Sequence, residues 1–116
     1  MLVTELVGRV NFHDSCLSKI TLLDQVVALN IDLCMWKQND YQEGDIELKE
    51  VNVVFKGIKN YSWDSEKSEE EVDYDTIINF NLEGNKIEVI LLDEEVIGRS
   101  YVSVMSFECM EVQLYY

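Results

Sequence analysis

The sequence predicts an all-β domain, either an antiparallel sandwich or a partly open barrel of about six to eight strands joined mostly by hairpins. Three observations indicate this fold class. Apolar and polar residues alternate with a period of two through most of the chain, and β-branched and aromatic residues fill the apolar positions. The sequence contains no proline, so long strands keep all of their backbone donors. Turn-forming residues separate the alternating segments.

The chain has 116 residues, which is the size of one domain with a modest core. Its hydrophobic fraction of 47% is ordinary for a folded globular protein. Neither an internal repeat nor a linker divides the sequence. We therefore expect a single domain over residues 1–116.

The first apolar segment leaves two alternatives open. Its apolar residues recur at helical spacing: Leu2, Val3, Leu6, Val7 and Val10. This spacing favours a short N-terminal helix. The three valines and Gly8 instead favour an irregular first strand.

A first hairpin is predicted from Leu17 onward, with a tight turn at residues 24–25. Its second strand places the odd-numbered residues in the core: Val27, Leu29, Ile31, Leu33 and Met35. Residues 38–45 then read as a loop. In the next strand, Ile46 and Leu48 point inward before the phase switches to Val51, which predicts a β-bulge near Glu50.

The strongest turn signal is Gly84-Asn85, because both residues tolerate positive φ. Counting outward from this turn pairs Glu83 with Lys86, Leu82 with Ile87, Phe80 with Val89 and Ile78 with Leu91. All of the apolar members of these pairs are predicted to face the core. Residues 93–95 and Gly98 predict a further turn, and a phase shift near residues 108–109 predicts a second bulge.

The formal net charge of −14 limits the classes of partner. Phosphate backbones and anionic membranes would be repelled, so we expect neither a nucleic-acid partner nor a membrane partner. A basic protein would be attracted, and its association accelerated. The sequence shows neither an apolar run long enough to span a membrane nor a signal peptide, so a cytoplasmic location is expected.

The three cysteines are odd in number and widely spaced: Cys16, Cys34 and Cys109. This pattern predicts reduced, mostly buried residues rather than a disulfide framework. Zinc ligands normally come in closely spaced pairs, and no such pair occurs here. We therefore expect no metal and no cofactor.

His13 is the only histidine and lies in the polar segment Asn11–Cys16. Neighbouring residues of an extended chain point to opposite faces, so His13, Asp14 and Ser15 cannot form a catalytic relay by themselves. A structural turn is the competing interpretation, with Asp14 or Ser15 accepting backbone N–H groups and His13 beside a carboxylate. The sequence predicts a protein that is not an enzyme.

Residues 64–75 carry seven acidic side chains against Lys67 alone. The first half of this run predicts a mobile solvated loop, since it lacks the residues to bury itself. It does not follow the order of a calcium-binding loop. Much of the negative charge of the chain lies in and after this run, so we predict that its later acids form the rim of a binding face. The candidate binding residues are Glu69, Glu70, Glu71, Asp73, Asp75, His13, Asp14 and Trp63.

Five aromatic residues offer a different class of site. Trp36, Tyr41, Tyr61, Trp63 and Tyr74 would suit a partner protein or a sugar if they were exposed together. If they point inward they belong to the core, as most strand aromatics do.

The segment Phe12-His13-Asp14-Ser15 resembles an element that precedes a strand hairpin in small, mostly uncharacterised bacterial β-domains. Residues 53–58 and 107–112 are similar to later parts of the same layout. Some of these domains resemble immunity proteins of bacterial toxin systems. The resemblance implies a protein-binding role and assigns no catalytic residue. We expect a non-enzymatic module that binds a basic partner, and the alternative is a β-domain that binds a small molecule or carbohydrate.

Overall fold

The structure is a computed structural model that describes residues 1–39, 41–94, 98 and 100–116. The helices found there are α1 (Val3–Arg9) and the short 3-10 helices η1 (Met35–Lys37) and η2 (Glu69–Glu71). The strands are β1 (Cys16–Leu23), β2 (Val26–Cys34), β3 (Leu48–Lys56), β4 (Lys59–Asp64), β5 (Asp75–Glu83), β6 (Lys86–Glu94), β7 (Ser100–Glu108) and β8 (Val112–Tyr115). No helix among these described segments is long and apolar enough to cross a membrane.

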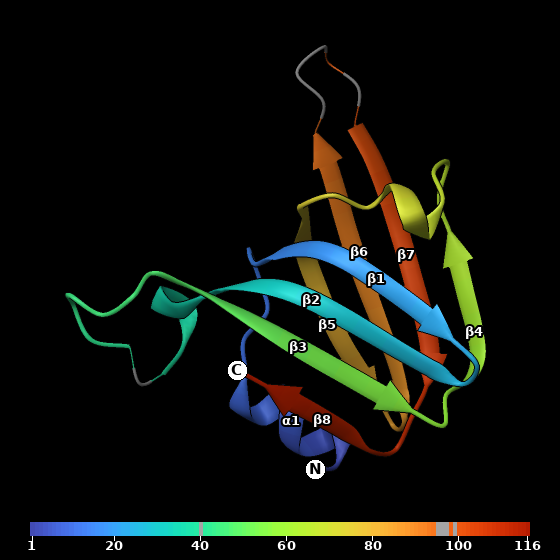
Figure 1. The fold of residues 1–116 in the computed structure, drawn as a ribbon, viewed down its shortest axis with the longest axis horizontal. Coiled ribbons are helices and arrows are strands. Elements are labelled where there is room, and N and C mark those ends of the chain that lie inside the picture. The colour runs from blue at the N-terminus through green and yellow to red at the C-terminus, as the bar shows by residue number, and fades with distance from the viewer. Residues whose placement is uncertain (40, 95–97, 99) are drawn as a thin grey trace.

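All of these strands belong to one antiparallel sheet, in the order β4-β7-β6-β5-β1-β2-β3-β8. Strands β1 and β5 pair at only two positions, Cys16 with Thr76 and Leu17 with Asp75. The sheet bends at this narrow seam, and in Figure 1 β1, β2 and β3 cross in front of β5 and β6. The all-β prediction is confirmed: the two halves face each other and the sheet does not close into a barrel.

The core lies between the two halves. Residues that the alternation predicts to face inward are buried in both of them: Leu29, Ile31, Leu33, Val89 and Leu91. Phe55 of β3 meets Phe107 of β7 edge to face, with 4.9 Å between the ring centroids. Side-chain contacts of this kind hold the two halves together, since strands β1 and β5 pair at only two positions.

The first apolar segment forms helix α1, so the helical alternative is the correct one. Val3 and Leu6 are buried on one side of the helix, which lies against β5. The backbone N–H of Val3 donates to the carbonyl of Met110 at 2.9 Å, which ties the helix start to the residues before β8. Figure 1 shows α1 beside β8, with both chain ends nearby.

The hairpin of β5 and β6 confirms most of the predicted register. Glu83 pairs with Lys86, Leu82 with Ile87, and Phe80 with Val89. The predicted Ile78–Leu91 pair is wrong, because a bulge between Ile77 and Asn79 makes Leu91 pair with Ile77. Ile77 is therefore the buried residue, while Ile78, Phe80 and Leu82 are only half-buried.

The bulge predicted near Glu50 is wrong. Strands β2 and β3 pair without interruption from Val26–Lys56 to Cys34–Leu48. Ile46 precedes β3, and Leu48 points away from the core on the same side as Glu50, so both are exposed. The apparent phase switch arises because a loop residue and an outward-facing residue happen to be apolar.

The second predicted bulge, near residues 108–109, is also wrong. Strand β7 ends at Glu108 in one half of the sheet, and β8 begins at Val112 beside β3 in the other half. The alternation of inward and outward residues restarts because the chain passes from one half of the sheet to the other. Asp93 and Glu94, predicted to lie in a turn, belong to β6 instead, and Glu95 lies outside the described residues.

Candidate functional site

A tight turn holds His13 at the surface. The N–H of Ser15 donates to the carbonyl of Phe12 at 3.0 Å, and Asp14 adopts a positive φ of 66°. Aspartate is among the residues that tolerate this conformation. The turn is attached to β5 by two backbone bonds, from Asp14 N–H to the Ile77 carbonyl at 2.9 Å and from Ile77 N–H to the Ser15 carbonyl at 2.7 Å.

The side chains of this segment have distinct positions. Ser15 is fully buried, and its Oγ accepts the backbone N–H of Cys34 at 2.9 Å. His13 is exposed, with its Nδ1 at 3.3 Å from Asp14 Oδ2. Lys37 Nζ approaches the same carboxylate oxygen, also at 3.3 Å. These contacts confirm the structural-turn interpretation of Ser15 and of His13 beside a carboxylate.

The acidic segment, residues 64–75, contacts the rest of the fold, so the prediction that its first half cannot bury itself is wrong: the Lys67 side chain is buried. Trp63 Nε1 donates to the Lys67 carbonyl at 2.7 Å, and the Tyr61 hydroxyl donates to Glu69 Oε2 at 3.1 Å. Ser68 and Glu71 form a capping box at the start of η2. Two aromatic residues of β4 therefore hold a loop that is polar by composition.

Lys67 makes the strongest of these attachments. Its ammonium lies 2.7 Å from Asp75 Oδ2 and 3.0 Å from Asp93 Oδ2. The Lys67 side chain is 8% exposed and that of Asp75 only 1%, so the pair is buried. Burial by itself would lower the pKa of Lys67, but the two carboxylates outweigh it and raise this pKa above its ordinary value. Asp75 is therefore an interior ion-pair partner, and its predicted place on an exposed rim is wrong.

The remaining acids of the segment have a different environment. Glu66, Glu70, Glu71 and Asp73 are exposed, and Glu69 is half-buried against Tyr61. Burial and the negative charge of Glu69 raise the pKa of Tyr61, so its hydroxyl remains a hydrogen-bond donor. Since Lys67 is neutralised in the interior, these carboxylates face solvent without a cation from their own segment.

The predicted binding residues thus fall into two groups. His13 and Asp14 belong to the turn before β1, whereas Glu69, Glu70, Glu71 and Asp73 lie between β4 and β5. Trp63 lies beside the second group but uses its indole N–H inside the fold. Sequence reasoning missed Lys67 and Asp93 as anchors, although a single lysine inside an acidic run was an available signal.

The five aromatic residues do not form one patch. Tyr61 and Trp63 pack against the core from β4, whereas Trp36 is exposed in η1. The teal helix η1 lies at the left of Figure 1 and β4 at the right. The core interpretation fits Tyr61 and Trp63. Tyr74 is 59% exposed and lies within the acidic segment, with a positive φ of 56°.

The three cysteines form no disulfide, and burial raises the pKa of each thiol. Cys34 and Cys109 are buried and Cys16 is half-buried, as predicted. The Cys34 thiol donates to the Asp14 carbonyl, and the Cys109 thiol donates to the Glu111 carbonyl. Within the described ranges, His, Cys, Asp and Glu side chains do not gather in groups of three or more that could hold a metal ion.

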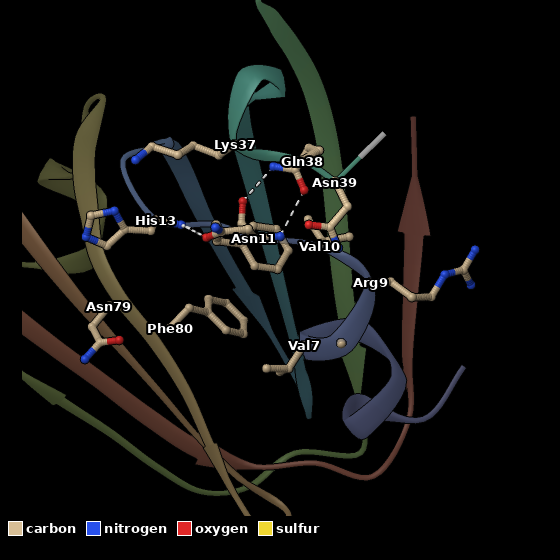
Figure 2. Close-up of a pocket in the computed structure, with 12 residues that line it drawn as sticks. Val7, Arg9, Val10, Asn11, His13, Lys37, Gln38, Asn39, Asn79 and Phe80 are labelled. Carbon is tan, nitrogen blue, oxygen red and sulfur yellow. Dashed lines mark hydrogen bonds between the residues drawn. The ribbon is translucent and has the colours of Figure 1, made fainter. Parts of the chain in front are cut away.

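A cavity of about 310 Å³ lies beside the His13 turn, and we call it the His13 cavity. Its described lining consists of residues 7–13, 37–39, 79 and 80. These residues come from α1, the turn, the end of η1 and β5, as Figure 2 shows. Sequence reasoning missed the cavity because no local motif connects four separate segments.

Comparisons of the chain with protein-family models, with curated proteins and with solved structures find no match.

Proposed function

We propose that this protein is a non-enzymatic interaction module that binds a basic protein partner through the acidic segment. The observation that carries the proposal is the position of Lys67. The one cation of the segment lies inside the fold between Asp75 and Asp93, which leaves the exposed surface of the segment acidic. A complementary basic surface would be attracted to it and steered toward it.

The order of the segment supports the same proposal. Solubility alone needs negative charge but no fixed arrangement of it. Here η2 is capped, and Tyr61, Trp63 and Lys67 hold the loop against the sheet. A surface that is already ordered loses less conformational entropy when a partner binds.

The resemblance of residues 12–15, 53–58 and 107–112 to immunity-type domains suggests one form of this function, in which the basic partner is a toxin. The charge argument requires only that the partner be basic. Capturing the partner from the source organism therefore comes first, and its association kinetics then test the proposed surface.

The test uses a triple variant, Glu66→Lys, Glu70→Lys and Asp73→Lys, in which every replaced side chain is exposed. Glu69, Glu71 and Asp75 are left intact because they make contacts within the fold. The matched control is Glu43→Lys, Glu47→Lys and Glu50→Lys, with the same charge change on the loop and strand start at the left of Figure 1.

With the captured partner, surface plasmon resonance at low salt should show a fall of about tenfold or more in on-rate for the first variant. The off-rate should change little, because rim charges act mainly on encounter. The control variant should retain an on-rate much closer to that of the wild type. If both variants slow association equally, the net charge of the protein and not the acidic segment sets the on-rate, which would refute the proposed surface. An unchanged on-rate in the first variant would refute it as well.

A further inference from the structure

The His13 cavity lies where the edge of β5 loses its neighbouring strand. Strand β5 is bonded to the chain before β1 only as far as Ile77, where the turn at Asp14 directs the chain away. Asn79 and Phe80 follow at the bulge and form one wall of the cavity. The opening is thus a consequence of the same turn that exposes His13.

The lining of this cavity differs in charge from the rest of the protein. The chain has 23 acidic residues and only 9 lysines and arginines. None of the described residues that line the cavity is acidic, whereas Arg9, Lys37 and His13 all belong to its lining. The carboxylate of Asp14 lies just outside, in contact with His13 and Lys37. Figure 2 shows the Arg9 side chain extending away from the other lining side chains, so the cation that reaches the cavity is the Lys37 ammonium.

The polar groups of the cavity are of two kinds. The Gln38 side chain is fully engaged, since it accepts the Asn11 N–H at 2.9 Å and donates to the carbonyls of Asn11 at 2.7 Å and Cys34 at 2.9 Å. These bonds fix one wall. In the described part of the chain, no hydrogen bond engages the side chain of Asn79. Figure 2 shows Asn79 and His13 on the same side of the cavity, with the Lys37 ammonium extending toward His13.

The floor of the cavity is apolar. The Phe80 ring packs against the buried Phe12 ring, with 4.6 Å between the centroids, and is only partly covered. Val7 lies across from it, as Figure 2 shows. Binding sites for small organic molecules commonly combine such an apolar floor with a few convergent polar groups.

We propose that the His13 cavity binds a small organic monocarboxylate with a flat apolar body. The carboxylate lies among the Lys37 ammonium, the His13 imidazole and the Asn79 amide, and the apolar body lies over Phe80 and Val7. The single Lys37 ammonium, which the ligand would share with Asp14, suits one carboxylate. The volume of about 310 Å³ suits a ligand at the lower end of the usual size range.

The test is a titration of the isotopically labelled protein followed by NMR, with three probes. Benzoate carries both the charge and the flat body, benzamide keeps the shape without the charge, and inorganic phosphate carries charge without the body. Benzoate should give saturable shifts confined to residues 7–13, 37–39 and 79–80, with a dissociation constant on the order of 1 mM for so small a probe. Benzamide and phosphate should each bind at least about tenfold more weakly.

Variants then test the assigned side chains. Lys37→Ala and Asn79→Ala should each weaken benzoate binding by about fivefold or more, because each removes a direct partner of the carboxylate. Lys86→Ala is the matched control, since Lys86 is an exposed lysine at the β5–β6 turn outside the described lining, and it should bind benzoate like the wild type. The spectrum of each variant reports whether its fold is intact.

The titration should extend to about 10 mM benzoate, roughly ten times the expected dissociation constant. If benzoate gives no saturable shifts over that range, the proposal is overturned. Equal binding of benzamide would show that the charge is irrelevant, and equal binding of phosphate would show that the apolar floor is irrelevant. Either result, or undiminished binding by Lys37→Ala, would refute the assignment.

Discussion

The buried ion pair gives the sharpest stability prediction. Replacing Lys67 by methionine keeps most of the apolar stem but removes the ammonium between Asp75 and Asp93. The Asp75 carboxylate, 1% exposed, then loses the cation that lies 2.7 Å away. Asp93 is 30% exposed and can be solvated, so the cost falls mainly on Asp75.

The magnitude follows from this burial. Removing one partner of a buried ion pair typically costs about 3–5 kcal/mol, because the other charge remains desolvated. Such a loss is a large part of the free energy of unfolding of a small domain, which is about 5–15 kcal/mol. Lys67→Met should therefore lower the free energy of unfolding by about 3–5 kcal/mol, measured by urea denaturation followed by circular dichroism.

A second variant separates the ion pair from general damage to the loop. Asp75→Asn removes the buried charge but keeps the oxygen that accepts the Asp73 N–H. The double variant, Lys67→Met with Asp75→Asn, should be more stable than Lys67→Met alone, since no unpaired charge is then buried. A change below about 1 kcal/mol in Lys67→Met, or simple additivity of the two substitutions, would contradict the buried-pair argument.

Three further predictions concern the fold. Folding raises the pKa of both Lys67 and Tyr61. Their contribution to stability is therefore complete below the unfolded pKa values of about 10 and is lost as pH rises through the folded values. Thermal unfolding should show stability falling above about pH 10, and falling less steeply in the Tyr61→Phe variant. Phe55→Ala should lower the free energy of unfolding by about 3–5 kcal/mol, and Phe80→Ala clearly less, because only Phe55 is fully buried. Equal losses for the two variants in urea denaturation would contradict the assigned burial. Ser15→Ala should lower the free energy of unfolding by about 1–3 kcal/mol, because the buried backbone N–H of Cys34 at the end of β2 loses its acceptor. An unchanged midpoint of urea denaturation would mean that another group accepts this N–H.

The sequence predicts the fold best where local rules decide it. Gly84-Asn85 sets the hairpin register from Glu83–Lys86 to Phe80–Val89, because the turn and the alternation agree. The prediction fails at Ile78, where the bulge shifts the phase. That bulge adjoins the attachment of the His13 turn to Ile77, which lies far away in the sequence.

The same limit applies to the candidate sites. Composition identifies the acidic segment, but it cannot show that Lys67 reaches Asp93 of a later strand, or that Asp75 is buried. The His13 cavity needs Lys37 and Asn79, which lie 79 − 37 = 42 positions apart in the sequence. Long-range packing decides such arrangements, and periodicity carries no information about it.

The narrow seam between β1 and β5 has a consequence for motion. Strands β4 to β7 form a continuous stretch of chain on one side of it, so we expect this half to open partly as a unit in hydrogen exchange. Asp75 pairs with Leu17 at the seam, while its carboxylate holds Lys67 of the acidic segment. A partner that binds the acidic segment would therefore also fasten the two halves together. Amide hydrogen exchange at Leu17 and Thr76 should slow when that partner is bound, even though neither residue belongs to the proposed contact surface.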